Sequence, residues 1–254
     1  MQDIPENHHT SYIKTGGDQW YPPIIVSINQ IGDMALSSFC LDKVMKIVDK
    51  LEQDDYTLFV KEFCQSGKER FNKKWQYADI TTALYAAAHF TKPRNYLEIG
   101  VRRGRSMAIV AATNPDCQIV AFDLWTSMYA NISNPGPEFV SKEMKKIGYQ
   151  GNIEFISGNS HKTLPAYLKN YPELFFDLVT VDGDHSENGA RKDLLTILPR
   201  IKVGGVIVFD DISHPSLPHL RKVWNDVVVN NFHFSSWEFK DLGFGVAMAI
   251  RRAF

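Results

Sequence analysis

The sequence predicts an α/β fold in which helices cover both faces of a doubly wound, seven-stranded sheet that is mostly parallel. Two observations support this prediction. From residue 77 onward, short apolar runs typical of buried strands alternate with helical patterns, and such alternation indicates crossover connections between parallel strands. The last two apolar runs, 236–240 and 245–250, follow each other with no helix between them. We therefore expect an antiparallel hairpin at the C-terminal end.

Each element is assigned from its own pattern. Helices are placed where apolar residues recur every three to four positions, and strands where a short apolar run is bounded by turn residues. The expected helices are 39–51, 56–63, 77–90, 106–112, 138–147, 162–169, 187–198 and 224–229. The expected strands are 96–99, 119–123, 153–156, 175–182, 206–211, 236–240 and 245–250, with breaks at 66–67 and 202–205 and a loop at 125–137.

The chain is expected to divide into a helical cap or extension, residues 1–75, and a catalytic domain, residues 76–254. In the turn-rich first 35 residues, the apolar patch at 24–28 is either a strand over a site or, as we favour, part of a packed extension. The cap is a candidate interface for a homo-oligomer.

Length and composition limit the protein to a few classes. The chain has 254 residues, of which 44% are hydrophobic, so it can bury a full core. Its formal net charge of −1, with mixed signs along the chain, provides no basic field for nucleic acid or a membrane surface. The sequence contains no signal-peptide pattern and no apolar run as long as a membrane span. We expect a cytoplasmic protein with a small-molecule partner.

A glycine turn after the first strand of the catalytic domain carries the clearest functional signal. It reads E-x-G-x-x-x-G-x-S, which is neither a dinucleotide fingerprint nor a phosphate-binding P-loop. Gly100 and Gly104 let backbone N–H groups approach a ligand, and the helix that opens near Ser106 favours a carboxylate or phosphate. Glu98 inside the turn suits a cationic ligand. Asp123 ends the next strand, where an acid can accept both hydroxyls of a ribose.

Together, the glycine turn and Asp123 resemble the class I methyltransferases that depend on S-adenosylmethionine (SAM). The resemblance implies a Rossmann-like sheet and SAM as the cofactor. The loop at 125–137 lies where a ligand-covering loop would lie, beyond the end of a strand. In that loop, Trp125 and Tyr129 either stack on a ligand ring or form the wall of the pocket, or they are aromatic side chains that a surface loop packs inward.

Five carboxylates follow strands of the predicted sheet. Because the carboxyl ends of parallel strands meet at one edge, Glu98, Asp123, Asp182, Asp210 and Asp211 should lie close together there and repel one another unless cations are present. The positive charges of SAM suit the first two, and Mg²⁺ or Mn²⁺ suits the last three, because these ions prefer hard oxygen ligands. A metal that binds a substrate hydroxyl lowers the pKa of that hydroxyl, which is chemistry suited to O-methylation. The alternative role of Asp210 and Asp211 is to cap the next helix.

The acids at this edge make the resemblance more specific. The sequence resembles metal-dependent O-methyltransferases of the catechol type, and it is similar to bacterial enzymes that methylate sugar hydroxyls of macrolides. The resemblance implies that Asp182, Asp210 and Asp211 bind the metal. It places His185 at the position of the general base, because an imidazole can accept the proton of a metal-bound hydroxyl. We take His185 and Asp182 as catalytic; the alternative role of His185 is to cap the following helix. The implied cofactor-binding residues are Glu98, Gly100, Gly104, Ser106, Asp123, Gly158, Asn159, Ser160, His161 and Asp182.

Two positions depart from the pattern of these families. Asn159 stands where other class I enzymes often carry an acid that binds the adenine amino group. Arg102 and Arg103 make the glycine turn more basic than usual, and we expect them to form surface ion pairs, with an acidic substrate as the alternative.

The sequence therefore predicts a SAM-dependent, Mg²⁺-assisted O-methyltransferase that acts on a hydroxyl of a sugar or natural-product scaffold. One alternative is a protein like the cephalosporin hydroxylases, but the sequence shows no pair of histidines with a carboxylate that would hold iron. Another alternative is a non-catalytic SAM-binding module. The presence of all four residues Asp182, His185, Asp210 and Asp211 argues against that alternative.

Overall fold

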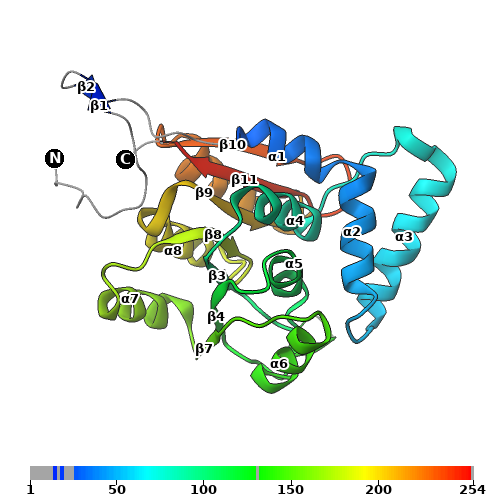
Figure 1. Ribbon diagram of the computed structural model, residues 1–254, viewed down its shortest axis with the longest axis horizontal. Coiled ribbons are helices and arrows are strands. Elements are labelled where there is room, and N and C mark those ends of the chain that lie inside the picture. The colour runs from blue at the N-terminus through cyan, green and yellow to red at the C-terminus, as the bar shows by residue number, and fades with distance from the viewer. Residues whose placement is uncertain (1–13, 16–17, 20–25, 130–131, 253–254) are drawn as a thin grey trace.

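A seven-stranded sheet with the strand order β10-β11-β9-β8-β3-β4-β7 forms the centre of the protein (Figure 1). The structure is a computed structural model that describes residues 14–15, 18–19, 26–129 and 132–252. Strands β9, β8, β3, β4 and β7 run parallel, whereas β11 pairs antiparallel with β9, and β10 with β11. The predicted sheet, mostly parallel with a C-terminal antiparallel hairpin, is confirmed.

The predicted strands are all present within a few residues of their expected bounds. They are β3 (Asn95–Ile99), β4 (Gln118–Asp123), β7 (Ile153–Ser157), β8 (Phe176–Val181), β9 (Ile201–Asp210), β10 (Phe234–Phe239) and β11 (Val246–Arg251). Two small antiparallel pairs lie outside the main sheet: β1 (Lys14–Thr15) with β2 (Asp18–Gln19), and β5 (Met128–Tyr129) with β6 (Ile132–Ser133).

Most of the described helices begin after a residue whose side chain caps them, whereas the helices Arg105–Thr113, Pro137–Lys146 and His219–Trp224 have no such cap. Ser37, Asp54, Asp79, Asn159 and Ser186 each accept a backbone N–H of the first helical turn with their side chains. The helices are α1 (Ile28–Ala35), α2 (Ser38–Val48), α3 (Asp55–Phe71), α4 (Ile80–Thr91), α5 (Arg105–Thr113), α6 (Pro137–Lys146), α7 (Ser160–Asn170), α8 (Glu187–Ile197) and α9 (His219–Trp224), with the short turns η1 (Asn72–Lys74), η2 (Leu198–Arg200) and η3 (Asn225–Val229). None of the helices that the structure describes is long and apolar enough to cross a membrane.

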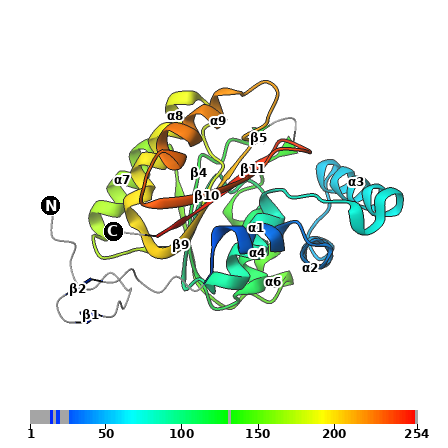
Figure 2. The same cartoon turned by 90° about the horizontal axis from the view of Figure 1, so that it is seen from above.

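Helices cover both faces of the sheet (Figure 2). α7, α8 and α9 pack on one face, and α1 and α4 lie on the other, with α2 beside them. Each face has its own cluster of buried apolar side chains. The cluster on the α4 face includes Val26 and Val44 from the N-terminal segment together with residues of α4 and α5. The N-terminal helices therefore share a core with the catalytic domain, and the boundary between residues 75 and 76 stays a prediction.

The N-terminal segment differs most from the sequence prediction. The patch at 24–28 ends in helix α1, which was not predicted, and residues 24 and 25 lie outside the described part of the chain. Ser27 and Gln30 form a reciprocal capping box that begins this short helix. α1 packs closely on β10, because a Cβ at Gly32 would lie 2.3 Å from the Trp237 ring. Trp237 lies some 200 positions further along the sequence, so this contact has no local signal.

Two glycine-containing segments that were predicted to interrupt the chain are continuous with their elements. α3 continues through Gly67 without a break. A Cβ at Gly67 would lie 2.2 Å from the ring of Trp75, so glycine is needed there to let the helix approach that ring. The turn expected at 202–205 lies inside β9, at a break in register with β8. Gly204 has a φ of +84°, a conformation typical of a β-bulge. In both cases glycine serves a tertiary contact or a bulge and does not end the element.

Candidate active site

The glycine loop, residues 100–104, joins β3 to α5 in a conformation that needs both of its glycines. Gly100 has a φ of +90°, and a Cβ at this position would lie 2.0 Å from the backbone oxygen of Asp182. Gly104 has a φ of +74° and precedes the first residue of α5, and its N–H donates to the oxygen of Val101 at 2.8 Å. The loop therefore passes directly beside the end of β8, close to the predicted metal ligands.

Asp123, the acid predicted to bind the ribose, holds the glycine loop in place through hydrogen bonds. Its Oδ2 accepts the backbone N–H groups of Val101 and Arg102, both at 2.8 Å. Its Oδ1 accepts the backbone N–H of Trp125 at 2.6 Å and the amide of Asn134 at 3.2 Å. Four donors from three segments thus occupy both oxygens. A ribose that binds Asp123 has to share or replace some of these donors.

Glu98 does not reach the ligand cavity, because its side chain is fully buried under the glycine loop. Tyr96 donates its hydroxyl hydrogen bond to Glu98 Oε2 at 3.0 Å, and the Ser106 hydroxyl donates to Oε1. Burial raises the pKa of Glu98 to about 8, although the two hydroxyls partly offset the effect. Glu98 and Ser106 therefore hold β3 and α5 together, and the positive charges of a ligand would act on Glu98 only at a distance.

A cavity of about 500 Å³ lies at the carboxyl ends of β3, β4, β7 and β8. This is the edge of the sheet at which ligands bind in open α/β folds. Of the predicted residues, the cavity is lined by Gly100, Asp123, Gly158, Asn159, Ser160, His161, Asp182 and His185. Glu98, Gly104 and Ser106 do not line it. A cavity therefore lies at the predicted edge of the sheet, three of the expected contact residues lie outside its lining, and the binding roles of the others stay a prediction.

The far end of the cavity is formed by the connection from β7 to α7. Gly158 has a φ of +127°, and its N–H donates to the backbone oxygen of Asp123 at 2.9 Å. Asn159 caps α7, because its Oδ1 accepts the N–H of His161 at 2.8 Å. Trp125 packs edge-to-face on Phe155 with ring centroids 5.9 Å apart, which favours a role in packing. The side chain of Tyr129 lies outside the described part of the chain.

Asp182, His185 and Asp211 form a compact triad at the ends of β8 and β9. One ligand atom from each lies within 4.8 Å of the others. His185 Nε2 is 3.3 Å from Asp182 Oδ1 and 3.1 Å from Asp211 Oδ2. Burial raises the pKa of Asp182, the His185 imidazole lowers it, and the charge of Asp211 raises it. Two carboxylates and an imidazole at this spacing are a donor set that fits a divalent metal ion.

Asp211 occupies its place in the triad through an unusual backbone conformation. Its φ is +63°, a region that Asp tolerates better than most residues. Its N–H donates to the oxygen of Gly245 at 3.0 Å, in the connection between β10 and β11. The antiparallel hairpin of β10 and β11 therefore helps to position Asp211 next to Asp182 and His185.

Asp210, the remaining predicted metal ligand, lies outside this triad, and His185 stands where a third carboxylate was expected. Burial raises the pKa of Asp210, and the charges of Asp182, Asp211 and Asp79 raise it further. Arg105 lies within electrostatic reach of Asp210 and stacks on the ring of Tyr56 at 4.5 Å. Asp210 thus lies between the triad and Arg105, which stacks on Tyr56 at the start of α3.

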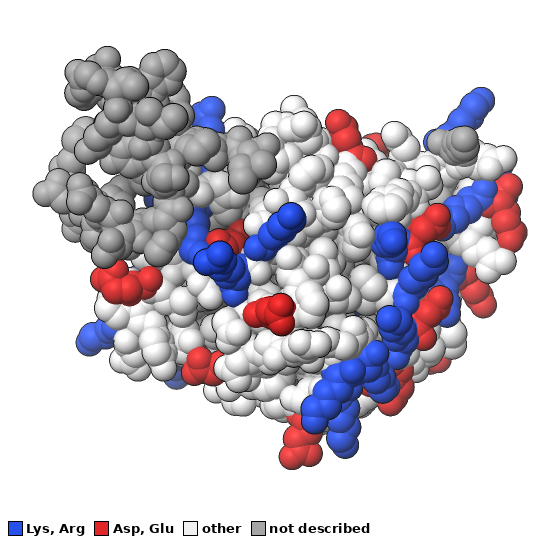
Figure 3. Space-filling view, in the orientation of Figure 1, with Lys and Arg blue, Asp and Glu red and all other residues white. Residues whose placement is uncertain are grey.

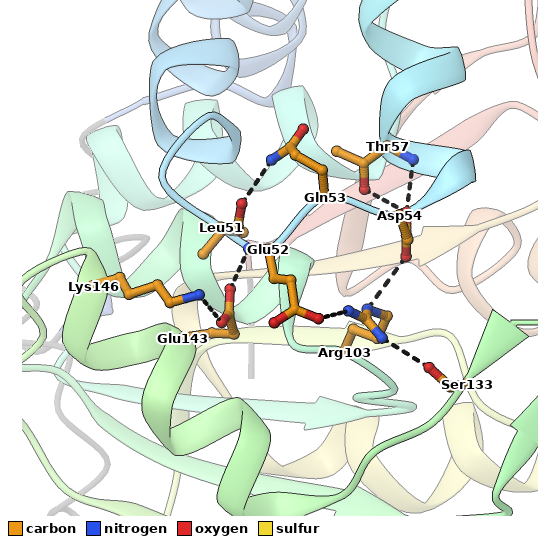
Figure 4. Close-up of polar contacts among 9 residues, drawn as sticks. All are labelled: Leu51, Glu52, Gln53, Asp54, Thr57, Arg103, Ser133, Glu143 and Lys146. Atoms are coloured by element: carbon orange, nitrogen blue, oxygen red, sulfur yellow. Dashed lines mark hydrogen bonds and ion pairs between the residues drawn. The ribbon is translucent and has the colours of Figure 1, made fainter.

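The cap contacts the glycine loop through one arginine (Figure 4). The Arg103 guanidinium pairs with Glu52 at 3.0 Å and Asp54 at 3.3 Å, both from the α2–α3 connection, and it donates to Ser133 Oγ at 2.9 Å. It also lies 4.5 Å from the centroid of the Phe139 ring. The expected ion pairs of Arg103 are present, but they bury its side chain to 13% exposure and do not leave it at the surface.

The acidic side chains at this contact have hydrogen-bond and ion-pair partners within the chain (Figure 4). Buried Glu143 of α6 accepts the backbone N–H of Glu52 at 2.7 Å and pairs with Lys146. Asp54 caps α3 through Thr57, whose N–H and hydroxyl donate at 2.8 and 2.6 Å. Burial alone would raise the pKa of Asp54, but the two Thr57 donors and then the charge of Arg103 bring it below its ordinary value.

The surface carries both signs of charge. On the face shown in Figure 3, lysines and arginines are most numerous over the α2, α3 and α6 side, and acidic side chains lie among them. This mixed distribution agrees with the formal net charge of −1.

Some residues that shape the site were not found from the sequence. Asn134 supports Asp123 from the loop that follows β6. His219, the first residue of α9, has its Nε2 2.7 Å from the backbone oxygen of His185. Because a carbonyl oxygen only accepts, Nε2 is the donor and holds the segment that carries His185. These contacts join distant segments, so no local spacing could have revealed them.

Part of the chain matches a known protein family. Residues 97–212 match the profile of a family described as a methyltransferase domain. The match spans the glycine loop, the triad and the parallel strands from β3 to β9, whereas β10 and β11 lie outside it. It confirms the predicted resemblance to methyltransferases and the predicted enzyme class. No match to the chain is found among curated protein sequences.

Solved structures confirm the fold. An O-methyltransferase from Bacillus cereus in complex with S-adenosylhomocysteine (SAH) is 16% identical, with a TM-score of 0.53 over 87% of this chain and 100% of that chain. The O-methyltransferase TomG of Streptomyces achromogenes, involved in tomaymycin synthesis and solved with SAM, is 16% identical, with a TM-score of 0.53 over 80% and 92%. CalS11, a TDP-rhamnose 3′-O-methyltransferase of calicheamicin biosynthesis, is 20% identical, with a TM-score of 0.52 over 84% and 93%.

Proposed function

We propose, from the premise that residues 97–212 form a methyltransferase domain, that this chain is a SAM-dependent O-methyltransferase acting on a hydroxyl of a small molecule, with a sugar or natural-product scaffold as the acceptor class. The observation that carries the proposal is the position of the Asp182–His185–Asp211 triad on the rim of the 500 Å³ cavity. A methyl donor in that cavity and a hydroxyl at the triad would be neighbours. The TDP-rhamnose and tomaymycin enzymes with the same fold support the choice of acceptor class.

The cavity offers matching groups for each part of SAM. Asp182 faces the cavity beside Gly100, where a carboxylate suits an ammonium or sulfonium charge. Asp123 lies in the middle of the lining, where an acid suits ribose hydroxyls. The segment 158–161 closes the far end, where the adenine would lie. The binding residues are therefore those of the sequence prediction that line the cavity.

The triad fits a divalent ion, with Asp182 and Asp211 as ligands and Mg²⁺ or Mn²⁺ as the ion. The fold holds its two carboxylates together although burial and then the charge of Asp211 raise the pKa of Asp182, and a cation between them would relieve this repulsion. When bound, such an ion supplies Lewis acidity that lowers the pKa of an acceptor hydroxyl. His185, whose Nε2 is 3.1 Å from Asp211 Oδ2, would then be the side chain that accepts the proton of that hydroxyl. Asp210 stays the predicted third ligand.

The cofactor is tested first by calorimetric titration of SAH into the purified protein. We expect micromolar binding to the wild type and at least tenfold weaker binding to Asp123→Ala. Because Asp123 also fastens the glycine loop, Asn134→Ala serves as the control, since it removes one loop contact and leaves the carboxylate. Absence of SAH binding to the wild type would overturn the proposal.

The roles within the triad are separated by Mn²⁺ binding, followed by electron paramagnetic resonance. Asp211→Asn should weaken Mn²⁺ binding at least tenfold, because the ion loses a charged ligand. His185→Gln should keep Mn²⁺ binding and lose methyl transfer by about 100-fold, the contribution typical of a general base. If His185→Gln loses Mn²⁺ as Asp211→Asn does, His185 is a metal ligand and the proposed base is wrong.

A further inference from the structure

Helix α9 is anchored to the strand that carries Asp211 into the triad. It begins at His219, beyond residues 97–212, the region that matches the methyltransferase family. Trp224, its last residue, is fully buried, and the Trp224 ring stacks on that of Phe209 with the centroids 5.7 Å apart and an angle of 7° between the planes. Phe209 lies in β9 two residues before Asp211. The position of α9 is therefore fixed relative to the end of β9.

α9 also lies beside the start of α8, the helix that follows His185. Lys222 Nζ is 3.1 Å from Oε1 of Glu187, the first residue of α8. Arg191 of α8 is 2.8 Å from Oδ2 of Asp226, which comes just after α9. These four side chains are at least 31% exposed, so each ion pair alone stabilises the fold only slightly. The two pairs nevertheless show that α9 packs close to the segment that carries His185.

One hydrogen bond joins α9 to the backbone of His185. Nε2 of His219 lies 2.7 Å from the backbone oxygen of His185, and the two residues are 34 positions apart in the sequence. Because a carbonyl oxygen only accepts, Nε2 carries the proton. The neutral ring in this tautomer and the charged ring both donate from Nε2, so the hydrogen bond does not depend on the charge of His219.

Other contacts hold the residues on either side of His185. Before it, the N–H of Asp182 donates to the oxygen of Ile99 in β3 at 2.9 Å. After it, the N–H of Ser186 donates to Asp184 Oδ1 at 2.8 Å, and Ser186 caps α8. These contacts fix the two ends of the segment, and α9 supplies a contact to His185 itself.

We propose that His219 is a positioning residue whose hydrogen bond sets the place of the His185 imidazole relative to Asp211. The inference rests on the proposed function, in which His185 accepts the proton of the acceptor hydroxyl. His185 follows β8 and Asp211 follows β9, and α9 links the two because Trp224 packs on β9 while His219 holds His185. The distance of 3.1 Å between His185 Nε2 and Asp211 Oδ2 is thereby maintained. A base that is already in place needs less ordering to reach the reacting geometry.

The test follows the His185 ring by NMR of protein labelled with carbon-13 at Cε1 of histidine, in EDTA so that no metal ion holds the ring. The chain has eight histidines, and the His185 signal is the one that His185→Gln loses. We expect one sharp signal in the wild type. In His219→Leu, which has no donor, other positions of the ring should become about five- to tenfold more populated and broaden the signal in relaxation-dispersion experiments. His219→Gln, whose amide can donate to the same carbonyl, should restore most of the sharp signal.

Lys222→Met is the matched control. It removes an ion pair between α9 and α8 and leaves the hydrogen bond of His219 in place, so the His185 signal should not change. Calorimetric titration of SAH is run on the same proteins. His219→Leu should keep the wild-type affinity, because His219 lies outside the lining of the cavity.

The outcomes separate the two proposals. If the wild type does not bind SAH, the proposed function fails, and His185 has no role as a base for His219 to support. If SAH binds but His219→Leu keeps a sharp His185 signal, or if Lys222→Met broadens it equally, the assignment of His219 is wrong and the proposed function stands. Should His219→Leu fail to fold, the nitrogen-15 spectrum of the wild type decides, because a neutral His219 ring protonated at Nδ1 cannot donate from Nε2.

Discussion

The two sides of the glycine loop hold the same kind of acid in opposite electrostatic states. On the cap side, the pKa of Asp54 is below its ordinary value, because the Thr57 donors and the charge of Arg103 outweigh burial. On the cavity side, burial and neighbouring carboxylates raise the pKa values of Asp182 and Asp210. The cap contact is thus complete within the chain, whereas the cavity rim has carboxylates whose repulsion is only partly relieved.

This difference indicates which side is built for a ligand. A contact whose charges are balanced stabilises the fold and gains little from an added cation. A rim of repelling carboxylates gains from a metal ion or from the positive charges of a cofactor, because each added cation removes repulsion. We therefore assign positioning of the loop to the cap side and ligand binding to the cavity side.

The largest expected effect comes from Gly100, which brings the loop against β8. In Gly100→Ala, the new Cβ would lie 2.0 Å from the Asp182 oxygen at a φ of +90°. We expect a loss of about 4 kcal/mol in the free energy of unfolding, measured with urea, from the sum of backbone strain and overpacking. SAH binding should be lost as well, because the loop and Asp182 must separate.

Gly148→Ala is the matched control for this change. Gly148 also has a positive φ, +85°, but a Cβ there would meet nothing within 4 Å. We expect it to cost about 1 kcal/mol through the left-handed backbone alone. If both variants lose the same free energy of unfolding, the loop has room for a Cβ at Gly100 and does not pack tightly against β8.

At neutral pH an intermediate effect is expected from Glu98, whose buried carboxyl has a pKa of about 8. Because this value is above that of the unfolded chain, the folded state binds more protons. The stability that Glu98 contributes is therefore complete below about pH 4.5 and is lost as the pH rises through about 8. The expected slope is about 1.4 kcal/mol per pH unit for a single proton within this window.

Glu98→Gln should remove that slope while keeping a polar group between Tyr96 and Ser106. Urea unfolding of both proteins from pH 5 to pH 9 measures the difference, which should grow in favour of the variant as the pH rises. Other buried acids titrate in both proteins and cancel in the comparison. A difference that does not change with pH would mean that Glu98 is ionised in the folded protein at neutral pH.

The smallest effect is expected on the cap side of the glycine loop, where the charges are balanced. Arg103→Ala removes two ion pairs and the hydrogen bond to Ser133, and we expect a loss of about 1–2 kcal/mol, because the group is largely buried. Arg221→Ala, which removes an ion pair with Glu238 from a 45% exposed arginine, should cost less than about 0.5 kcal/mol. SAH binding to Arg103→Ala should weaken about 3- to 10-fold through the loosened loop. Unchanged binding would show that the cap does not position the loop.

The sequence by itself determined the alternation of strands and helices, the glycine turn and the edge at which the acids meet. These features depend on local periodicity and on strand direction, which neighbouring residues encode. It also placed Asp182, His185 and Asp211 together correctly, because each follows the end of a strand. α1 and the bulge in β9 were missed, since packing against distant segments decides them.

Only the tertiary structure decided what each acid does. Asp123 and Glu98 both lie at the glycine turn, yet one receives four donors at the cavity and the other is buried beneath the loop. Arg103 turns to the cap, and His185 takes the place in the triad that was expected for Asp210. A side chain's charge state and partners depend on burial and on groups that are distant in the sequence, and these exist only once the chain has folded.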